Sequence, residues 1–130
     1  MSTDVIQKLR ISGGQRVLVV NANERQKDLL SGLPAGARLV EAGEADVVVL
    51  FAHDSAELKT HLQRAAGAAE GDRLFWICYP KKGAGVQSDL SRDRLRDLAV
   101  EAGVEAVSQI ALDATWSALR FRPAHLYQKK

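Results

Sequence analysis

The sequence predicts an α/β domain with a mostly parallel sheet between two layers of helices and an antiparallel hairpin at its C-terminal end. Three observations predict this class. Apolar runs rich in β-branched residues recur along the chain, and such runs are typical of strands buried on both faces. Stretches with helical spacing alternate with these runs. The last two strand-like stretches are separated by a short turn, which favours a hairpin.

The size and composition of the chain are those of one ordinary globular domain. It has 130 residues, of which 46% are hydrophobic and 26% are charged. A chain of this size buries about two-thirds of its unfolded surface on folding. We therefore expect a single domain over residues 1–130, with a core that requires neither disulfides nor metal.

The first elements follow from apolar spacing and from the residues that interrupt it. Val5 and Leu9 have the spacing of one helical face, and the apolar run at 17–20 predicts the first buried strand. Asn23 can cap a short helix over residues 24–31. These elements predict a helix, a strand and a second helix in succession.

A weak strand is expected at Ala37–Glu41, shortly before a clear buried strand at 46–51. Only a few residues separate the two, whereas a parallel connection needs about a dozen. Either the first strand is weak or the two are not parallel neighbours. The sequence does not place Ala37–Glu41 in the sheet.

A third helix and a third clear strand follow. Asp54 and Glu57 are spaced as in a capping box, and apolar residues recur at helical spacing from there to Ala69. Gly71 ends this helix, and Leu74–Tyr79 reads as a buried strand. The alternation of strands and helices predicts right-handed crossovers.

The last part of the chain predicts one more helix and the hairpin. Ser88 or Ser91 caps the helix, and Gly103 lies where a glycine commonly ends one. The hairpin consists of two strands and a turn, at 104–112, 116–121 and 113–115. The whole pattern predicts a Rossmann-like three-layer sandwich.

Composition argues against several classes of protein. The net charge of +2, from 18 basic and 16 acidic residues, does not favour a nucleic-acid binder. Cys78 is the single cysteine, which excludes an internal disulfide and a zinc site built on cysteines. The N-terminus does not read as a signal peptide, and no apolar run approaches the ~20 residues of a membrane span. We expect a cytoplasmic protein with no membrane contact, metal or cofactor.

Several short motifs resemble a bacterial family of small α/β domains of unknown function, over about residues 4–122. The most specific of these are the aromatic-Pro-Lys loop that begins at Tyr79 and the Trp-Ser-small-Leu-basic-Phe strand that begins at Trp116. Asn23 departs from the pattern, because the family more often has proline there. The resemblance implies a fold but no activity, and no site residue carries over.

The order of elements also resembles the C-terminal half of S-adenosylmethionine-dependent methyltransferases. That layout runs from an Asp-led strand to a helix ending in Ala102-Gly103 and a closing hairpin. Such cofactor sites use a glycine-rich turn after the first strand, whereas this chain has the residues 21–24, Asn-Ala-Asn-Glu. The acid expected after a second strand is matched only by Glu41. A working methyltransferase is therefore an alternative rather than the leading hypothesis.

The loop that follows the Leu74–Tyr79 strand is the first candidate site. It leaves the carboxyl end of a buried strand, where ligands bind in open α/β sheets. Tyr79 begins it, Lys81 and Lys82 supply positive charge, and Gly83 and Gly85 leave backbone N–H groups accessible. The alternative is a solvated turn without a ligand, and the loop lacks the residues of a phosphate-binding Walker motif.

The last strand is the second candidate. Alternation places Trp116, Arg120 and Arg122 on one face, together with Ala118. An aromatic and basic face can stack on and pair with an anionic partner. The alternative is a hairpin strand whose apolar face packs in the core while its arginines shield an edge.

The remaining polar residues give weaker signals. His53, His61 and His125 are scattered, which favours satisfied histidines over metal ligands. Cys78 lies within a strand and is expected to pack as a small hydrophobic residue. Asp113 reads as a turn residue.

Three functional hypotheses follow. The leading one is a non-catalytic module that binds an anionic small ligand or a protein partner through the Lys81–Lys82 loop and the basic face of the last strand. The rival is a diverged methyltransferase-like enzyme, which a deep pocket beside Asn21 and Ala52 would favour and a filled apolar space would disfavour. The third is a structural role in which the hairpin pairs across a homodimer.

Overall fold

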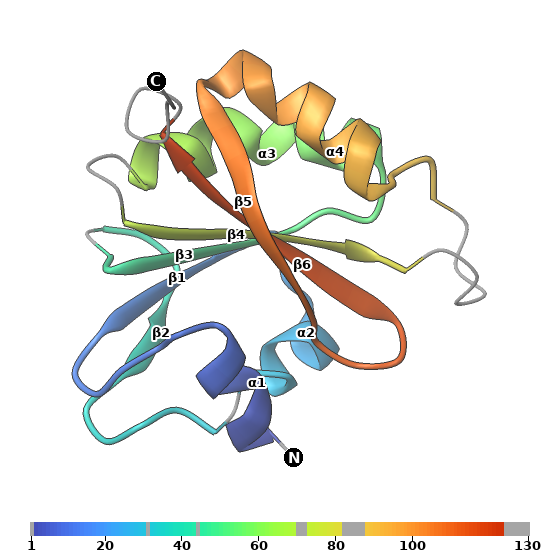
Figure 1. Ribbon diagram of the computed structural model, residues 1–130. Coiled ribbons are helices and arrows are strands. Elements are labelled where there is room, and N and C mark those ends of the chain that lie inside the picture. The colour runs from blue at the N-terminus through green and yellow to red at the C-terminus, as the bar shows by residue number, and fades with distance from the viewer. Residues whose placement is uncertain (1, 31, 44, 70–72, 82–87, 124–130) are drawn as a thin grey trace.

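The computed structural model describes residues 2–30, 32–43, 45–69, 73–81 and 88–123. Six strands form one sheet in the order β2-β1-β3-β4-β6-β5 (Figure 1). The strands are β1 (Arg16–Val20), β2 (Arg38–Val40), β3 (Val47–Phe51), β4 (Leu74–Pro80), β5 (Val104–Ala111) and β6 (Trp116–Pro123). The helices are α1 (Ser2–Lys8), α2 (Glu24–Asp28), α3 (Ser55–Ala68) and α4 (Arg92–Ala99), with a 3-10 turn at Val100–Ala102. This is the predicted mixed α/β sandwich.

The sheet is parallel through its first four strands and antiparallel at its C-terminal edge. Strand β1 pairs in parallel with β2 on one side and with β3 on the other. The short connection between β2 and β3 therefore joins strands that are not neighbours, which resolves the question left by the sequence. Strand β4 pairs in parallel with β3 and antiparallel with β6, and β5 pairs antiparallel with β6.

Helices cover both faces of the sheet, as Figure 1 shows: α3 and α4 lie on one face, and α1 and α2 on the other. Because successive side chains of a strand point to opposite faces, the core has two halves. Leu50 and Ile77 belong to the half under α3 and α4. Phe51 and Trp76 belong to the half under α1 and α2, where the Trp76 indole donates to the Leu9 carbonyl oxygen at 3.1 Å.

One helix boundary and one helix cap differ from the prediction. Helix α2 ends at Asp28 rather than extending to residue 31. At its start, Asn23 forms the complete reciprocal capping box with Gln26, whereas Asp54 accepts from the Glu57 backbone N–H but Glu57 reaches back to His53 instead. Glu57 therefore closes the loop before the helix rather than the cap itself. Among the helices of the described ranges, none is long and apolar enough to cross a membrane.

Candidate functional site

Two pockets lie at the carboxyl ends of parallel strands, one beside the ends of β1 and β3 and one beside the end of β4. Each has a volume of about 360 Å³. We call them the strand-end pocket and the Tyr79 pocket. The strand-end pocket is lined by Asn21, Ala22, Asn23, Gln26, His53, Glu57 and Trp116. The Tyr79 pocket is lined by Tyr79, Lys81, Ser91, Arg92, Asp93, Gln109 and Ser117.

Asn21 shapes the strand-end pocket through its backbone and its side chain. It follows β1 directly and has a left-handed backbone, with φ of 61°, a conformation that asparagine tolerates better than most residues. Its amide nitrogen donates to the Phe51 carbonyl oxygen at 2.8 Å and to Glu57 Oε1 at 3.0 Å. The side chain thus ties the end of β1 to the end of the adjacent strand β3.

Glu57 and the capping box of α2 supply the other polar groups that line the strand-end pocket. Glu57 Oε1 also accepts from the His53 backbone N–H at 2.8 Å. Asn23 Oδ1 accepts from the Gln26 N–H, and Gln26 Oε1 accepts from the Asn23 N–H. Because both amide oxygens are used by the cap, the NH₂ groups of these two residues are the parts that can serve a ligand.

An aromatic side chain and the pattern of charge set the chemistry of the strand-end pocket. The Trp116 ring meets the Phe51 ring edge to face, with 5.6 Å between centroids and 80° between planes. Among the described residues that line the pocket, Glu57 is the only carboxylate and none is lysine or arginine. The pocket therefore suits a neutral or cationic ligand with a flat ring better than a phosphate.

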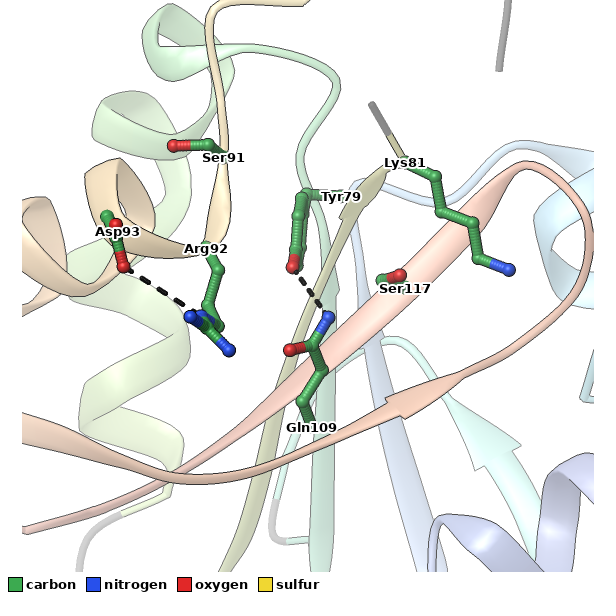
Figure 2. Close-up of a pocket in the computed structure, with 7 residues that line it drawn as sticks. All are labelled: Tyr79, Lys81, Ser91, Arg92, Asp93, Gln109 and Ser117. Atoms are coloured by element: carbon green, nitrogen blue, oxygen red, sulfur yellow. Dashed lines mark hydrogen bonds and ion pairs between the residues drawn. The ribbon is translucent and has the colours of Figure 1, made fainter. Parts of the chain in front are cut away.

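The Tyr79 pocket lies between the end of β4, the start of α4 and the β5–β6 hairpin (Figure 2). Tyr79 and Ser117 are opposite each other in the antiparallel β4–β6 register, and both are buried, with 4% and 5% exposure. The Gln109 amide nitrogen, from β5, donates to the Tyr79 hydroxyl at 3.1 Å. Buried hydroxyl groups from two strands therefore form the floor of this pocket.

Burial raises the pKa of the Tyr79 phenol above its ordinary value, against the opposing effects of the Arg92 charge and the Ser117 hydroxyl. Desolvation disfavours the charged phenolate. Tyr79 is accordingly a neutral hydrogen-bonding group at physiological pH.

Two cations flank these hydroxyl groups. Figure 2 shows Arg92 extending from the start of α4 toward Tyr79 and Gln109, with Lys81 beyond Ser117 on the other side. Asp93 lies 3.8 Å from Arg92 Nε and 3.7 Å from Arg96 Nη1. The lining residues thus carry two positive charges and one negative charge, and the negative charge is shared with a second arginine outside the pocket.

The alternation of β6 separates the two pockets. Trp116 and Ser117 are neighbours in sequence, yet Trp116 lines the strand-end pocket and Ser117 lines the Tyr79 pocket. The Trp116 side of β6 packs with the core half under α1 and α2, whereas Leu119 belongs to the other half. The first two residues of β6 therefore line different pockets.

The structure groups the predicted site residues in a different way from the sequence. It places Tyr79 and Lys81 in one pocket and Trp116 in the other. On β6, Arg120 is opposite Trp76 of β4, and Arg122 is opposite Glu105 of β5. Neither arginine is among the lining residues of the two pockets. The predicted residues Lys82, Gly83 and Gly85 lie outside the described part of the chain.

Sequence reasoning missed Arg92, Gln109 and Ser117 as lining residues of the Tyr79 pocket. Arg92 had a usable signal, because it follows the predicted cap Ser91 at the start of a helix that faces a strand end. Gln109 and Ser117 had none, because the strand registers place Ser117 opposite Tyr79 and Gln109 opposite Leu119, from where the Gln109 amide reaches the Tyr79 hydroxyl.

Asp113 and Cys78 have the structural roles that the sequence predicted. Asp113 Oδ1 accepts from the backbone N–H groups of Thr115 and Trp116 at 2.8 Å each, which makes it a turn residue. Cys78 is fully buried, and burial raises the pKa of its thiol far above the ordinary value. Within the described ranges, no group of three His, Cys, Asp or Glu side chains is arranged to hold a metal ion.

Comparison with known proteins gives a fold and no closer relationship. No protein-family model matches the sequence, and no curated protein matches it. The expected resemblance to a small family of unknown function is therefore not supported by these comparisons.

The structure is similar to those of methyltransferases. Magnesium protoporphyrin IX methyltransferase from Synechocystis PCC 6803, with bound S-adenosylmethionine, matches with a TM-score of 0.59 and 8% identity over 93% of this chain and 75% of that one. A methyltransferase from Aquifex aeolicus that depends on S-adenosylmethionine matches with a TM-score of 0.55 and 7% identity, over 94% of this chain and 89% of that one. A protein of the NADB-Rossmann superfamily from Streptococcus agalactiae matches with a TM-score of 0.53 and 13% identity, over 92% of this chain and 67% of that one. At these identities the similarity shows the fold alone: this chain has a Rossmann-like, methyltransferase-like α/β fold.

Proposed function

We propose that this chain is a diverged methyltransferase-like domain that binds an S-adenosyl compound in the strand-end pocket. The observation that carries the proposal is the position of that pocket at the carboxyl ends of the adjacent parallel strands β1 and β3. In open α/β sheets this edge is where ligands bind. The similarity in fold to methyltransferases supports the same alternative.

The chemistry of the lining residues fits an adenosyl group better than a dinucleotide. S-Adenosylmethionine contains a flat base and a sulfonium cation and lacks a phosphate. Trp116 offers an indole on which a base can stack, and the NH₂ groups of Asn23 and Gln26 can donate to ring nitrogens. The Glu57 carboxylate supplies the charge that complements a cation. A phosphate would find no lysine or arginine among the described lining residues.

The missing glycine turn is the main departure from a methyltransferase site. Glycines there allow a left-handed backbone and a close approach of the ligand. Asn21 supplies the first of these requirements with its φ of 61°, whereas its side chain occupies the space between β1 and β3. We therefore expect weak binding and a ligand placed toward Trp116 and His53 rather than against the β1 backbone.

When bound, S-adenosylmethionine would supply an electrophilic methyl group. The chain's own residues then have three roles in the proposal: Trp116 orients the base, Glu57 balances the cation, and Asn21 fixes the mouth of the pocket by joining β1 to β3. His53 also lines the pocket. Its bond to Glu57 is made by the backbone N–H, so a substitution of the imidazole side chain keeps that bond.

A binding experiment with matched ligands tests the proposal. Isothermal titration calorimetry with S-adenosylhomocysteine and adenosine should show binding, and ATP and NAD should show none. His53→Ala should weaken S-adenosylhomocysteine binding by about fivefold, whereas His61→Ala, a histidine on α3 outside the pocket, should leave it unchanged. Absence of binding by both adenosyl ligands, or equal binding of ATP, would contradict the proposal.

A further inference from the structure

The Tyr79 pocket, which the proposed function does not use, has the chemistry of an anion site. We propose that it binds a small phosphate monoester. Its lining residues come from β4, α4 and both strands of the hairpin, so the pocket depends on tertiary packing rather than on one loop. It differs from the strand-end pocket in charge, because Lys81 and Arg92 line the former and no lysine or arginine lines the latter.

The buried hydroxyl groups can donate hydrogen bonds to a ligand. A side-chain amide nitrogen can only donate, so the bond from Gln109 at 3.1 Å uses the Tyr79 oxygen and not its hydrogen. The phenol hydrogen remains available to an acceptor, and if Ser117, which lies opposite Tyr79, accepts it, the Ser117 hydroxyl can donate in turn. A ligand oxygen in the pocket is therefore an acceptor that this pair of hydroxyl groups can serve.

The charged side chains make an anionic acceptor the best fit. Arg92 extends toward Tyr79 and Gln109, and Lys81 lies on the other side, beyond Ser117, with its side chain extending away from Tyr79 (Figure 2). Asp93 offsets part of this charge, but it lies 3.8 Å from Arg92 Nε, and with two cations and one carboxylate the lining residues keep a net positive charge. A guanidinium and an ammonium group with hydroxyl donors between them are the groups that proteins use to bind phosphate oxygens.

The size of the pocket favours an ester over the free ion. Its volume of about 360 Å³ is at the lower end of the range for small-molecule pockets and far exceeds that of a phosphate ion. The buried ring of Tyr79 forms part of the wall and can contact an apolar substituent. A phosphate with a small organic group attached would therefore fill the site better than inorganic phosphate.

Calorimetry with phenyl phosphate, inorganic phosphate and phenol tests this assignment. Phenyl phosphate should bind, inorganic phosphate should bind at least about fivefold more weakly, and phenol should not bind measurably. Arg92→Ala and Lys81→Ala should each weaken phenyl phosphate binding about tenfold, as expected for a lost hydrogen bond to a charged group. Tyr79→Phe, which keeps the ring, should weaken it about fivefold.

Arg96→Ala is the matched control, because Arg96 shares the ion pair with Asp93 but does not line the pocket. It should leave phenyl phosphate binding within twofold of the wild type. The assignment is overturned if phenyl phosphate does not bind, or if Arg96→Ala weakens binding as much as Arg92→Ala. Failure of S-adenosylhomocysteine to bind would reject the proposed function and leave this result unaffected, since the two sites have no lining residue in common.

Discussion

The strand-end pocket and the Tyr79 pocket have equal volumes, but they are built in different ways. The strand-end pocket lies between parallel strands and is held by hydrogen bonds from Asn21 and Glu57 to the ends of β1 and β3. The Tyr79 pocket lies between antiparallel strands and a helix start, and its cations are partly exposed. The first arrangement gives a hydrogen-bonded pocket with no lysine or arginine among its described lining residues. The second places an exposed arginine and a lysine around buried hydroxyl groups.

The start of β6 contributes one residue to each of the two pockets. Adjacent residues of a strand point to opposite faces, so Trp116 and Ser117 face different pockets. The aromatic residue and the hydroxyl residue at the start of β6 therefore belong to separate sites. The sequence-based hypothesis combined the Lys81–Lys82 loop with Trp116, Arg120 and Arg122, whereas the structure places Lys81 and Trp116 in different pockets.

The largest effect on stability is expected at Asn21, in the strand-end pocket. Asn21→Ala removes hydrogen bonds to Phe51 and Glu57 and places alanine in a left-handed conformation, with an expected loss of about 2–3 kcal/mol. Asn21→Gly removes the same bonds without the strain, so it should lose about 1–2 kcal/mol. Urea denaturation measures both. Equal losses would show that the backbone conformation of this residue does not matter.

The two helix caps give the next effect. Asn23→Ala removes the part-buried bond that Asn23 Oδ1 accepts from the Gln26 N–H at 2.9 Å and leaves the backbone half of the capping box in place. Ser91→Ala removes an exposed and longer bond, which Ser91 Oγ accepts from the Arg94 N–H at 3.2 Å. We expect losses of about 1–1.5 kcal/mol and about 0.5–1 kcal/mol respectively. The free energy of unfolding from urea denaturation checks the order. A larger loss of stability for Ser91→Ala than for Asn23→Ala would contradict this order.

A smaller effect, visible only at high pH, is expected at Tyr79. The pKa of its phenol in the folded state is raised above 10.0 by burial. An unfolded phenol then loses its proton first, so the stability that this group contributes is complete below pH 10 and falls as the pH rises through the folded pKa. Tyr79→Phe should therefore lose less stability than the wild type between pH 9 and pH 11. Parallel slopes for the two proteins would show that the phenol titrates normally.

The smallest effect is expected at the surface charges of the Tyr79 pocket. The side chain of Arg92 is 59% exposed and its ion pair with Asp93 is long, at 3.8 Å. Arg92→Ala and Arg96→Ala should each change the free energy of unfolding by less than about 0.5 kcal/mol. Thermal unfolding in low and moderate salt measures this. A loss above about 1 kcal/mol would mean that Arg92 supports the fold rather than a ligand.

Much of the fold could be predicted from the sequence because its strands are buried on both faces. Runs such as 46–51 and 74–79 leave little choice of structure. The position of the short strand at 38–40 was not predictable, because β2 is partly exposed and its pairing with β1 is set by the fold as a whole. The end of α2 was also missed, since apolar residues continue beyond Asp28 without being helical.

The sites could be predicted only in part. The rule that ligands bind at strand ends led to the candidate loop that begins with Tyr79 and Lys81, and both residues line a pocket. A pocket beside Asn21 and Ala52 was named only as the observation that would favour the enzyme hypothesis. The sequence could not reveal that Gln109 reaches the Tyr79 hydroxyl, because a polar residue on an edge strand gives no signal of its partner. The left-handed turn at Asn21 was hidden for a similar reason, since most asparagines after a strand have no such conformation.

A pair of ¹H–¹⁵N NMR titrations of the ¹⁵N-labelled protein tests whether the two pockets are separate binding sites. S-Adenosylhomocysteine should shift the backbone amides of Ala22 and His53, and phenyl phosphate should shift those of Lys81 and Arg92. Each ligand should give the same shifts when the other is already present. Shifts at the same residues with both ligands, or displacement of one ligand by the other, would contradict the account.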